Sequence, residues 1–273
     1  MRISILGCGW LGFPLAQHLL NNDHKVKGST TTPEKKTKLE KAGIDSYHFK
    51  LPDDFNSVSD SNFWDCDLLF INIPPGRKRD DVLEYFPDII KKLIEIIEAH
   101  SINKVIFISS TSVYSPYGGV TTEEEADFQS AARDSGRALL KAEELFLNSN
   151  SFETIIIRFG GLYGYDRHPV KYLTGKKKLK SANKPVNLIH QDDCIAIIDK
   201  IIESDFKPGI YNAVSDGHPP REAFYKSAAS HFNLPEPEFL NDDETNYRVV
   251  SNKKLKDTFG YEFLYPNPMD HTP

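Results

Sequence analysis

Three glycines near the start of the chain have the spacing of a phosphate-binding turn. Gly7, Gly9 and Gly12 form the pattern G-x-G-x-x-G between the apolar run 2–6 and a helical pattern. In that order the first glycine permits a tight turn, and the second lets the backbone approach a pyrophosphate. The third lets the helix pack closely on the strand, while the helix N-terminus offers N–H groups to the anion. The sequence therefore predicts a dinucleotide-binding site.

Four neighbouring residues are expected to complete this site. They are Trp10 and Leu11 within the turn, and Ile73 and Pro74 at the end of a continuous apolar run that starts at Leu68. Such a run is typical of a central parallel strand, whose carboxyl end faces the same edge as the glycine turn.

The end of the expected second strand indicates which cofactor the site prefers. An NAD site usually has a carboxylate about 20 residues after the glycines, where it binds the ribose hydroxyls. At this point the chain has no carboxylate but Thr30, Thr31 and Thr32, and Lys35 and Lys36 follow a few residues later. Hydroxyls and ammonium groups can receive a 2′-phosphate that a carboxylate would repel. We therefore expect NADP(H) in preference to NAD(H), with Thr30 and Thr31 in the site, although a polar turn with Thr32 as helix cap explains the same residues.

Composition excludes several classes of protein. The chain has 273 residues, 39% of them hydrophobic and 26% charged, as in ordinary globular proteins. A net charge of −6 argues against nucleic acid or an acidic membrane as a partner. Three cysteines without C-x-x-C spacing indicate neither disulfides nor zinc. We expect a cytoplasmic protein with a small-molecule substrate, and the sequence is compatible with a homodimer.

Strands and helices alternate along most of the chain, which predicts an α/β fold with a Rossmann-like, doubly wound parallel sheet. The expected strands are 2–6, 25–29, 46–51, 68–73, 104–109, 154–158 and 209–214. The expected helices are 10–21, 33–42, 88–100, 131–148, 192–203, 220–232 and a last short one that Ser251 caps and Gly260 ends. We expect an NAD(P)-binding domain over 1–165 and a smaller substrate lobe over 166–273, interleaved with the last strands.

Several segments together resemble the extended short-chain dehydrogenase/reductase superfamily of the nucleotide-sugar epimerase/dehydratase type. Besides the glycines, these are Ile108 to Tyr114 at the end of the fifth strand, Arg158 to Gly164, Ile189 to Asp193 and Ile210 to Ala213. The resemblance implies an NAD(P)-dependent enzyme with a serine, a tyrosine and a lysine in its active site. The tyrosine transfers the proton, and the lysine lies one helical turn further on the same face.

The expected helix 131–148 departs from that pattern, because it contains no tyrosine. Ser110 matches the family serine. The better alignment puts Ser135 at the tyrosine position and Leu139 at the lysine position, and a second alignment uses Arg137 and Lys141. A serine hydroxyl cannot replace a phenol, whose pKa is near 10 before tuning. The resemblance therefore predicts an atypical member that keeps the cofactor site and has lost the catalytic pair.

Other side chains are candidates for the missing role by residue type. Tyr163 is the favoured one, because it follows the sixth strand; Tyr114 is expected to pack at a strand end. Arg167 and His168 could meet an anionic substrate, but a solvated loop pair is the simpler interpretation. His190 and Asp193 are expected to cap a helix and bond the backbone. The lysines Lys176, Lys177, Lys178, Lys180 and Lys184 could bind a diphosphate, and a solvated face is favoured.

Two functions are open at this point. One is an enzyme that performs redox or epimerase chemistry on a polar, nucleotide-linked or similar substrate, with Ser110 as the retained catalytic residue. The other is a binding module that senses the NADP(H) balance for a partner. The retained serine favours the enzyme, and the lost tyrosine and lysine favour the module.

Overall fold

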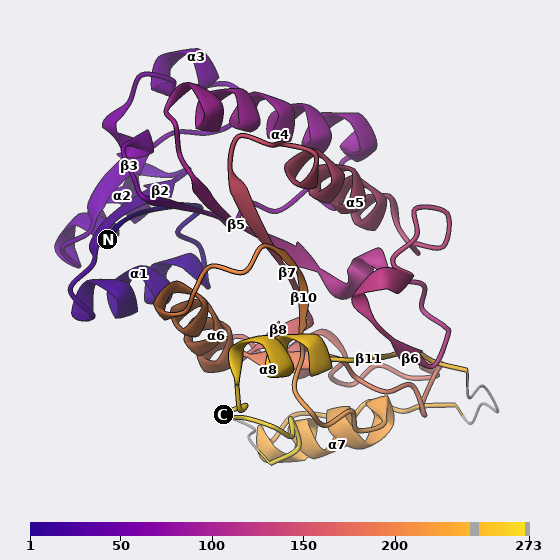
Figure 1. The fold of residues 1–273 in the computed structure, drawn as a ribbon. Coiled ribbons are helices and arrows are strands. Elements are labelled where there is room, and N and C mark those ends of the chain that lie inside the picture. The colour runs from indigo at the N-terminus through magenta and orange to yellow at the C-terminus, as the bar shows by residue number, and fades with distance from the viewer. Residues whose placement is uncertain (241–245, 271–273) are drawn as a thin grey trace. The chain divides into compact units, whose positions relative to one another are not determined.

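The computed structural model describes residues 1–240 and 246–270, and Figure 1 shows its elements. The strands are β1 (Arg2–Leu6), β2 (Lys25–Thr30), β3 (Asp45–His48), β4 (Leu68–Ile71), β5 (Lys104–Ser110), β6 (Val120–Thr121), β7 (Glu153–Phe159), β8 (Gly161–Tyr163), β9 (Leu188–His190), β10 (Gly209–Ala213) and β11 (Val249–Val250). The helices are α1 (Gly12–Asn21), α2 (Pro33–Lys41), α3 (Phe55–Val58), α4 (Val82–Ala99), α5 (Asp134–Leu147), α6 (Gln191–Glu203), α7 (Arg221–His231) and α8 (Lys253–Phe259).

A seven-stranded sheet has the order β10-β7-β5-β4-β1-β2-β3. The pairs β3–β2, β2–β1, β1–β4 and β4–β5 are all parallel, so their carboxyl ends meet at one edge. In Figure 1, α1 lies on one side of this sheet and α4 and α5 lie side by side on the other. The strand order reverses between β1 and β4, and ligands of such sheets bind at that switch point. The expected Rossmann-like α/β fold is confirmed.

Burial explains why the central strands form where they do. All four residues of β4 are buried, as are the last four of β1. Strands covered by helices on both faces are expected to be apolar throughout. Each buried aliphatic side chain contributes ~1.5–3 kcal/mol relative to exposure, so the two central strands supply much of the core.

Several element boundaries differ from the expectation. Helix α4 begins at Val82, six residues before the expected Asp88, and it contains Pro87. Helix α5 begins at Asp134 and not at Ala131, because Arg133 is extended, with φ −144° and ψ 151°. The short strands β6, β8, β9 and β11 were not expected; each has only two or three residues, too few to show periodicity.

The chain divides into two compact units. Unit 1 comprises Met1–Val113, Arg133–Ile157 and Asp205–Ile210, and unit 2 comprises Tyr114–Ala132, Arg158–Ser204 and Tyr211–Pro273. The expected boundary at residue 165 falls inside unit 2. The assignment of cofactor to one domain and substrate to the other stays a prediction.

Unit 2 has its own core. Tyr163, Val186, Leu188 and Phe224 form a buried cluster, and β8 pairs with β9 in parallel. Within the described residues, no helix is both long and apolar enough to cross a lipid bilayer.

Candidate cofactor and active site

Two of the three motif glycines are required by the packing of the chain itself. Gly7 has φ +104°, and a Cβ there would lie 2.6 Å from the carbonyl oxygen of Asn72. A Cβ on Gly12 would lie 2.3 Å from the carbonyl oxygen of Gly7. Only glycine fits such a turn, because any side chain would force the start of α1 away from β1 and β4.

Gly9 is different, because nothing in the protein requires a glycine there. The residue is exposed, its φ is not positive, and a Cβ would meet no protein atom within 4 Å. A glycine at this point of the motif lets the protein backbone approach the pyrophosphate of a ligand closely. The position therefore fits a bound pyrophosphate.

The N-terminus of α1 also fits an anion. Its N-cap is Leu11, which makes no side-chain cap bond, and the first turn contains no acidic residue. The first N–H groups of a helix have no acceptor within the helix, and their partial positive charge favours a phosphate. Gly9 and this helix end together supply what a dinucleotide pyrophosphate needs.

Two polar residues that were not singled out from the sequence hold the turn in place. The N–H of Gly7 donates to the Ser29 hydroxyl (3.0 Å), and the N–H of Cys8 donates to the Ser29 carbonyl (2.8 Å). The Asn72 amide nitrogen donates to the Gly7 carbonyl at 3.2 Å. The turn after β1 is thus fixed to the ends of β2 and β4. A polar residue inside the apolar run 68–73 was the available signal for Asn72.

The four expected neighbours lie at the same edge. A Cβ on Gly7 would lie 3.5 Å from the Ile73 side chain, and Pro74 follows in an exposed position. Trp10 is half-buried and Leu11 is buried, so Leu11 can offer a ligand only its backbone. Their contact with a cofactor stays a prediction.

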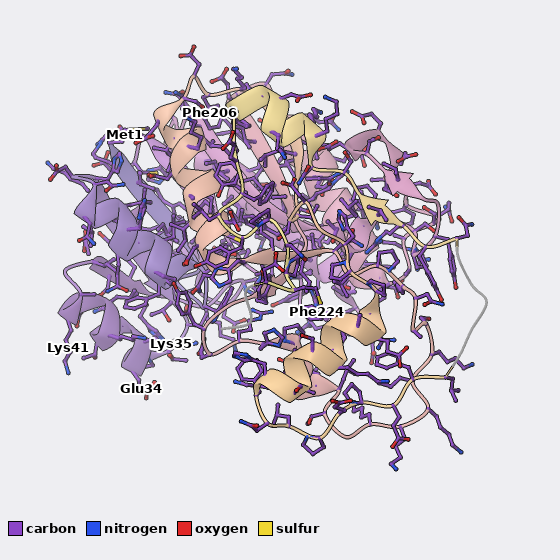
Figure 2. All side chains as sticks on the ribbon, turned by 90° about the horizontal axis from the view of Figure 1, so that it is seen from below. Met1, Glu34, Lys35, Lys41, Phe206 and Phe224 are labelled. Atoms are coloured by element: carbon purple, nitrogen blue, oxygen red, sulfur yellow. The ribbon has the colours of Figure 1, made fainter. Side chains whose placement is uncertain are left out.

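The end of β2 has the hydroxyls that a 2′-phosphate would meet, with one acid nearby. Thr30 is buried and Thr31 is exposed. Thr32 is the N-cap of α2, but its side chain makes no cap bond. Lys36 is paired with Glu40 at 3.3 Å, whereas Lys35 is exposed beside Glu34 in the first turn of α2. Figure 2 shows Glu34 and Lys35 together at this end of the helix.

Ser110 ends β5, which is separated from β1 in the sheet only by β4. Its hydroxyl is half-buried and accepts the N–H of Ser112 at 3.1 Å. A hydroxyl that accepts one bond keeps its own proton to donate. The turn therefore fixes the oxygen of Ser110 and leaves it able to donate to a substrate oxygen.

The face of α5 that packs toward β5 has no titratable group at the two family positions. Ser135 is 6% exposed and Leu139 is 4% exposed. One turn further, the buried carboxylate of Glu143 accepts a hydrogen bond from the Ser109 hydroxyl. A Cβ on Gly136 would lie 2.4 Å from the Ser112 carbonyl, so the helix start is in close contact with the turn after β5. A phenol and an ammonium are absent from this described face.

The residues of the second alignment point elsewhere. The Lys141 ammonium donates to the Leu83 carbonyl on α4 at 3.2 Å, and Arg137 pairs with Asp134 at 2.6 Å. Tyr172 and Lys176 have the tyrosine-to-lysine spacing, but Tyr172 belongs to a 3₁₀ turn and is 71% exposed. Neither pair reproduces the family arrangement on α5.

Tyr163 lies in unit 2, fully buried, with its ring edge-on to His190 at 5.1 Å between centroids. Burial raises the pKa of the Tyr163 phenol well above its usual range. The phenol is thus a poor proton donor or base, and its environment is that of a core residue. The catalytic role predicted for Tyr163 finds no support in this burial and stays a prediction.

The expectation that Arg167 and His168 form a solvated loop pair is wrong for His168. It is 1% exposed and not solvated, although its neighbour Arg167 is exposed. Its Nδ1 accepts the N–H of Val170 at 3.2 Å, and its ring stacks on Phe224 of α7, which Figure 2 labels. Burial lowers the pKa of His168 to about 4, so the ring is neutral at pH 7. The sequence missed this because the stacking partner lies more than 50 positions away.

The structural roles expected for three other residues are confirmed. The Tyr114 phenol is buried and donates to Asn212 at 2.6 Å. The His190 ring accepts the N–H of Asp192 and caps α6. The Asp193 carboxylate accepts from the Tyr261 hydroxyl and from the N–H of Leu264 and Tyr265. The lysine run is solvated as favoured, except for Lys184, which is half-buried over the Tyr247 ring at 5.9 Å.

A family model described as NAD(P)H-binding matches residues 7–193, starting at the first glycine of the turn. The chain belongs to the NAD(P)H-binding family. In the described residues there is no cluster of three side chains that could hold a metal ion.

Known proteins extend the likeness over the whole chain. Protein YeeZ of Escherichia coli strain K12 is 32% identical over 271 residues, which cover 98% of this chain and 97% of that protein. ADP-L-glycero-D-manno-heptose-6-epimerase of Helicobacter pylori matches with a TM-score of 0.78 and 17% identity, covering 98% of this chain and 92% of that one. The Bordetella bronchiseptica enzyme WbmG, in complex with NAD and UDP, matches with a TM-score of 0.80 and 13% identity, covering 99% of this chain and 92% of that one. The fold is that of the epimerase/dehydratase-type short-chain dehydrogenases/reductases, as the sequence motifs predicted.

Proposed function

We propose that this protein uses a nicotinamide dinucleotide for redox or epimerase chemistry on a polar small molecule. The observation that carries the proposal is the position of the Ser110 hydroxyl. It stands at the carboxyl edge of the sheet that holds the glycine turn, with only β4 between the two strands. An epimerase of an ADP-linked sugar and an enzyme solved with NAD and UDP share this fold, which supports a nucleotide-linked substrate.

In this proposal, different residues bind the cofactor and assist the reaction. Gly9 and the N-terminus of α1 would hold the pyrophosphate, and Ser29 and Asn72 hold the turn in the required shape. When bound, the cofactor supplies hydride transfer. Ser110 donates a hydrogen bond to the substrate oxygen and stabilises the charge that develops there.

NADP(H) is the proposed cofactor. Thr31 and Lys35 are both exposed at the carboxyl end of β2 and the start of α2, where they can meet a 2′-phosphate. Glu34 opposes this preference through its charge, which keeps the expected difference small. Separate titrations with NADPH and NADH test it, and tighter binding of NADH would overturn it.

Loss of the family tyrosine sets a condition on the chemistry. Since Ser135 and Leu139 are buried and cannot exchange a proton with a substrate near neutral pH, no phenol on α5 assists the reaction. Such a site fits a substrate whose oxygen must be polarised by a hydrogen bond. It does not fit a substrate whose oxygen must be fully deprotonated.

The test is a panel of carbonyls, alcohols and sugar nucleotides, assayed by the absorbance of the reduced nicotinamide. Where activity is found, Ser110→Ala is expected to lower kcat by about 10²–10³, the usual loss for one preorganised donor. Ser112→Ala, which changes the same turn but keeps the Ser110 hydroxyl, is the matched control. An activity that Ser110→Ala leaves unchanged would remove Ser110 from the mechanism.

A second candidate is a binding module that senses the NADP(H) balance. The buried, non-titratable pair Ser135 and Leu139 on α5 favours it. This candidate predicts cofactor binding without turnover across the whole panel. A homodimer is also proposed for the protein, and analytical ultracentrifugation tests it.

A further inference from the structure

The turn that follows β4 contains two cations for which the described residues provide no partner. Arg77 and Lys78 are exposed, and neither forms a hydrogen bond or ion pair with residues 1–240 or 246–270. Together with Arg79, Asp80 and Asp81, they give segment 77–81 three positive and two negative charges, in a chain whose net charge is −6. The local charge is therefore opposite in sign to that of the whole protein.

The turn is held in shape by its own residues. The N–H of Arg79 donates to the Gly76 carbonyl at 2.9 Å, and Gly76 has φ +84°. The Arg79 guanidinium makes two bonds of 2.8 Å to the Asp81 carboxylate and lies 3.7 Å from the centre of the Tyr85 ring. These contacts engage Arg79 and Asp81 and fix the shape of the turn. Arg77 and Lys78 lie at the tip of this turn.

The N-terminal end of the helix that follows carries charges of both signs. Asp81 is the N-cap residue of α4 but makes no side-chain cap bond, because its carboxylate is paired with Arg79. Helix α4 has 18 residues, and its dipole places partial positive charge at the end of the turn, which the carboxylates of Asp81 and Glu84 oppose. The positive charge of the site therefore comes from Arg77 and Lys78.

The position of the turn relates it to the cofactor edge. Strand β4 stands between β1 and β5, and the sheet reverses its order between β1 and β4. Asn72, directly after β4, bonds the glycine turn at 3.2 Å, and the chain runs from there through Pro74 and Pro75 to Arg77. Arg77 and Lys78 thus follow the strand that borders the switch point, where ligands of such sheets bind.

We propose that Arg77 and Lys78 form a phosphate-binding site at the carboxyl edge of β4. A guanidinium binds phosphate oxygens in a bidentate manner, and an adjacent ammonium adds a second charge. The phosphate belongs either to the substrate or to the 2′-position of the cofactor. The inference rests on the proposed function in taking the dinucleotide to occupy the glycine turn.

The experiment uses inorganic pyrophosphate as the probe for a substrate phosphate, titrated by calorimetry into protein saturated with NADH. Saturation keeps the pyrophosphate off the glycine turn. NADPH and NADH are titrated separately to probe the 2′-phosphate. The variant is the double substitution Arg77→Gln and Lys78→Gln. The control is Lys25→Gln with Lys41→Gln, which removes the same charge from the start of β2 and the end of α2, at the opposite edge (Figure 2 labels Lys41).

The variant is expected to bind pyrophosphate at least tenfold more weakly than the wild type, the loss of about one charge-assisted hydrogen bond. The control double variant keeps the wild-type affinity. If the variant instead loses affinity for NADPH and not for NADH, the site binds the 2′-phosphate of the cofactor. Both results support a phosphate site at this turn.

Three results would overturn the proposal. In the first, the Arg77→Gln and Lys78→Gln variant binds every probe with the affinity of the wild type. In the second, the control variant loses as much affinity as this variant does. In the third, the wild type neither binds pyrophosphate nor prefers NADPH to NADH. If the wild type binds neither dinucleotide, the proposed function fails. Pyrophosphate titrated without NADH then still compares the variant with its control. Melting temperatures verify that the variants fold, and Arg77→Gln alone replaces the double variant if that one melts early.

Discussion

The ammonium of Lys141 on α5 donates a hydrogen bond of 3.2 Å to the backbone carbonyl of Leu83 on α4. Leu83 stands four residues before Pro87, whose nitrogen has no hydrogen to give to that carbonyl. Lys141 therefore satisfies an acceptor that the proline leaves unsatisfied inside α4, and it ties the two helices together. The same bond gives Lys141 a structural role in place of the catalytic one that the second alignment would assign.

Replacing this lysine tests that role. Lys141→Met is expected to lower the free energy of unfolding by ~1 kcal/mol, because the Leu83 carbonyl loses its partner. NADPH affinity should not change. Lys91→Met is the control, since Lys91 pairs with Asp88 on the exposed side of α4. Urea unfolding and calorimetry measure the two quantities. A variant of normal stability that loses cofactor affinity would favour the second alignment.

The buried carboxylate of Glu143 leads to a second prediction. It accepts the Ser109 hydroxyl beside Ser110, so it fixes the end of β5 against α5. Glu143→Leu leaves that hydroxyl without an acceptor and is expected to cost ~1–3 kcal/mol. Glu143→Gln keeps an acceptor oxygen of the same reach and should cost less. Urea unfolding ranks the variants, and a leucine variant as stable as the glutamine variant would refute the bond as a source of stability.

His168 makes stability depend on pH. Its folded-state pKa of about 4 lies below the value of 6.5 for an unperturbed histidine, so the unfolded chain binds the extra proton between these values. The contribution is complete above pH 6.5 and is lost as the pH falls toward 4. Between pH 7.5 and pH 5 we expect a loss of roughly 2 kcal/mol from this group.

The measurement is urea unfolding of the wild type and of His168→Gln at both pH values. Glutamine does not titrate, so the difference between the two proteins isolates the histidine from carboxylates such as Asp193. A difference that does not change with pH would contradict a buried, neutral His168.

The sequence predicted those parts of the fold and site that depend on local pattern. The glycine spacing and the apolar runs of β1 and β4 are written in consecutive residues. They identified the fold, and residues that carry no such periodicity were missed. Ser29 acts through a hydrogen bond to a neighbouring strand, which no local pattern reveals. For Asn72, which bonds the glycine turn, the one local signal is its polarity within an apolar run.

Other misses have a common physical cause in tertiary contacts. A proline such as Pro87 normally ends a helix, yet α4 continues through it. The Leu83 carbonyl, which Pro87 leaves without a donor inside the helix, accepts a hydrogen bond from Lys141. His168 follows an arginine in a polar segment, and only the packing of α7 shows that it is buried. The roles of Ser110, Ser135 and Tyr163 in chemistry stay predictions.

Calorimetric titration of NADPH and NADH tests most directly whether the turn at Gly9 holds a dinucleotide. The proteins are the wild type, Gly9→Val and Gly12→Ala. Since a Cβ at Gly9 would meet no protein atom within 4 Å, Gly9→Val is expected to melt close to the wild type, whereas Gly12→Ala should melt earlier because its Cβ meets the Gly7 carbonyl. We expect the wild type to bind at least one dinucleotide and Gly9→Val to bind it more than tenfold less tightly at unchanged stability. A wild type that binds neither dinucleotide, or a Gly9→Val protein with wild-type affinity, would contradict it.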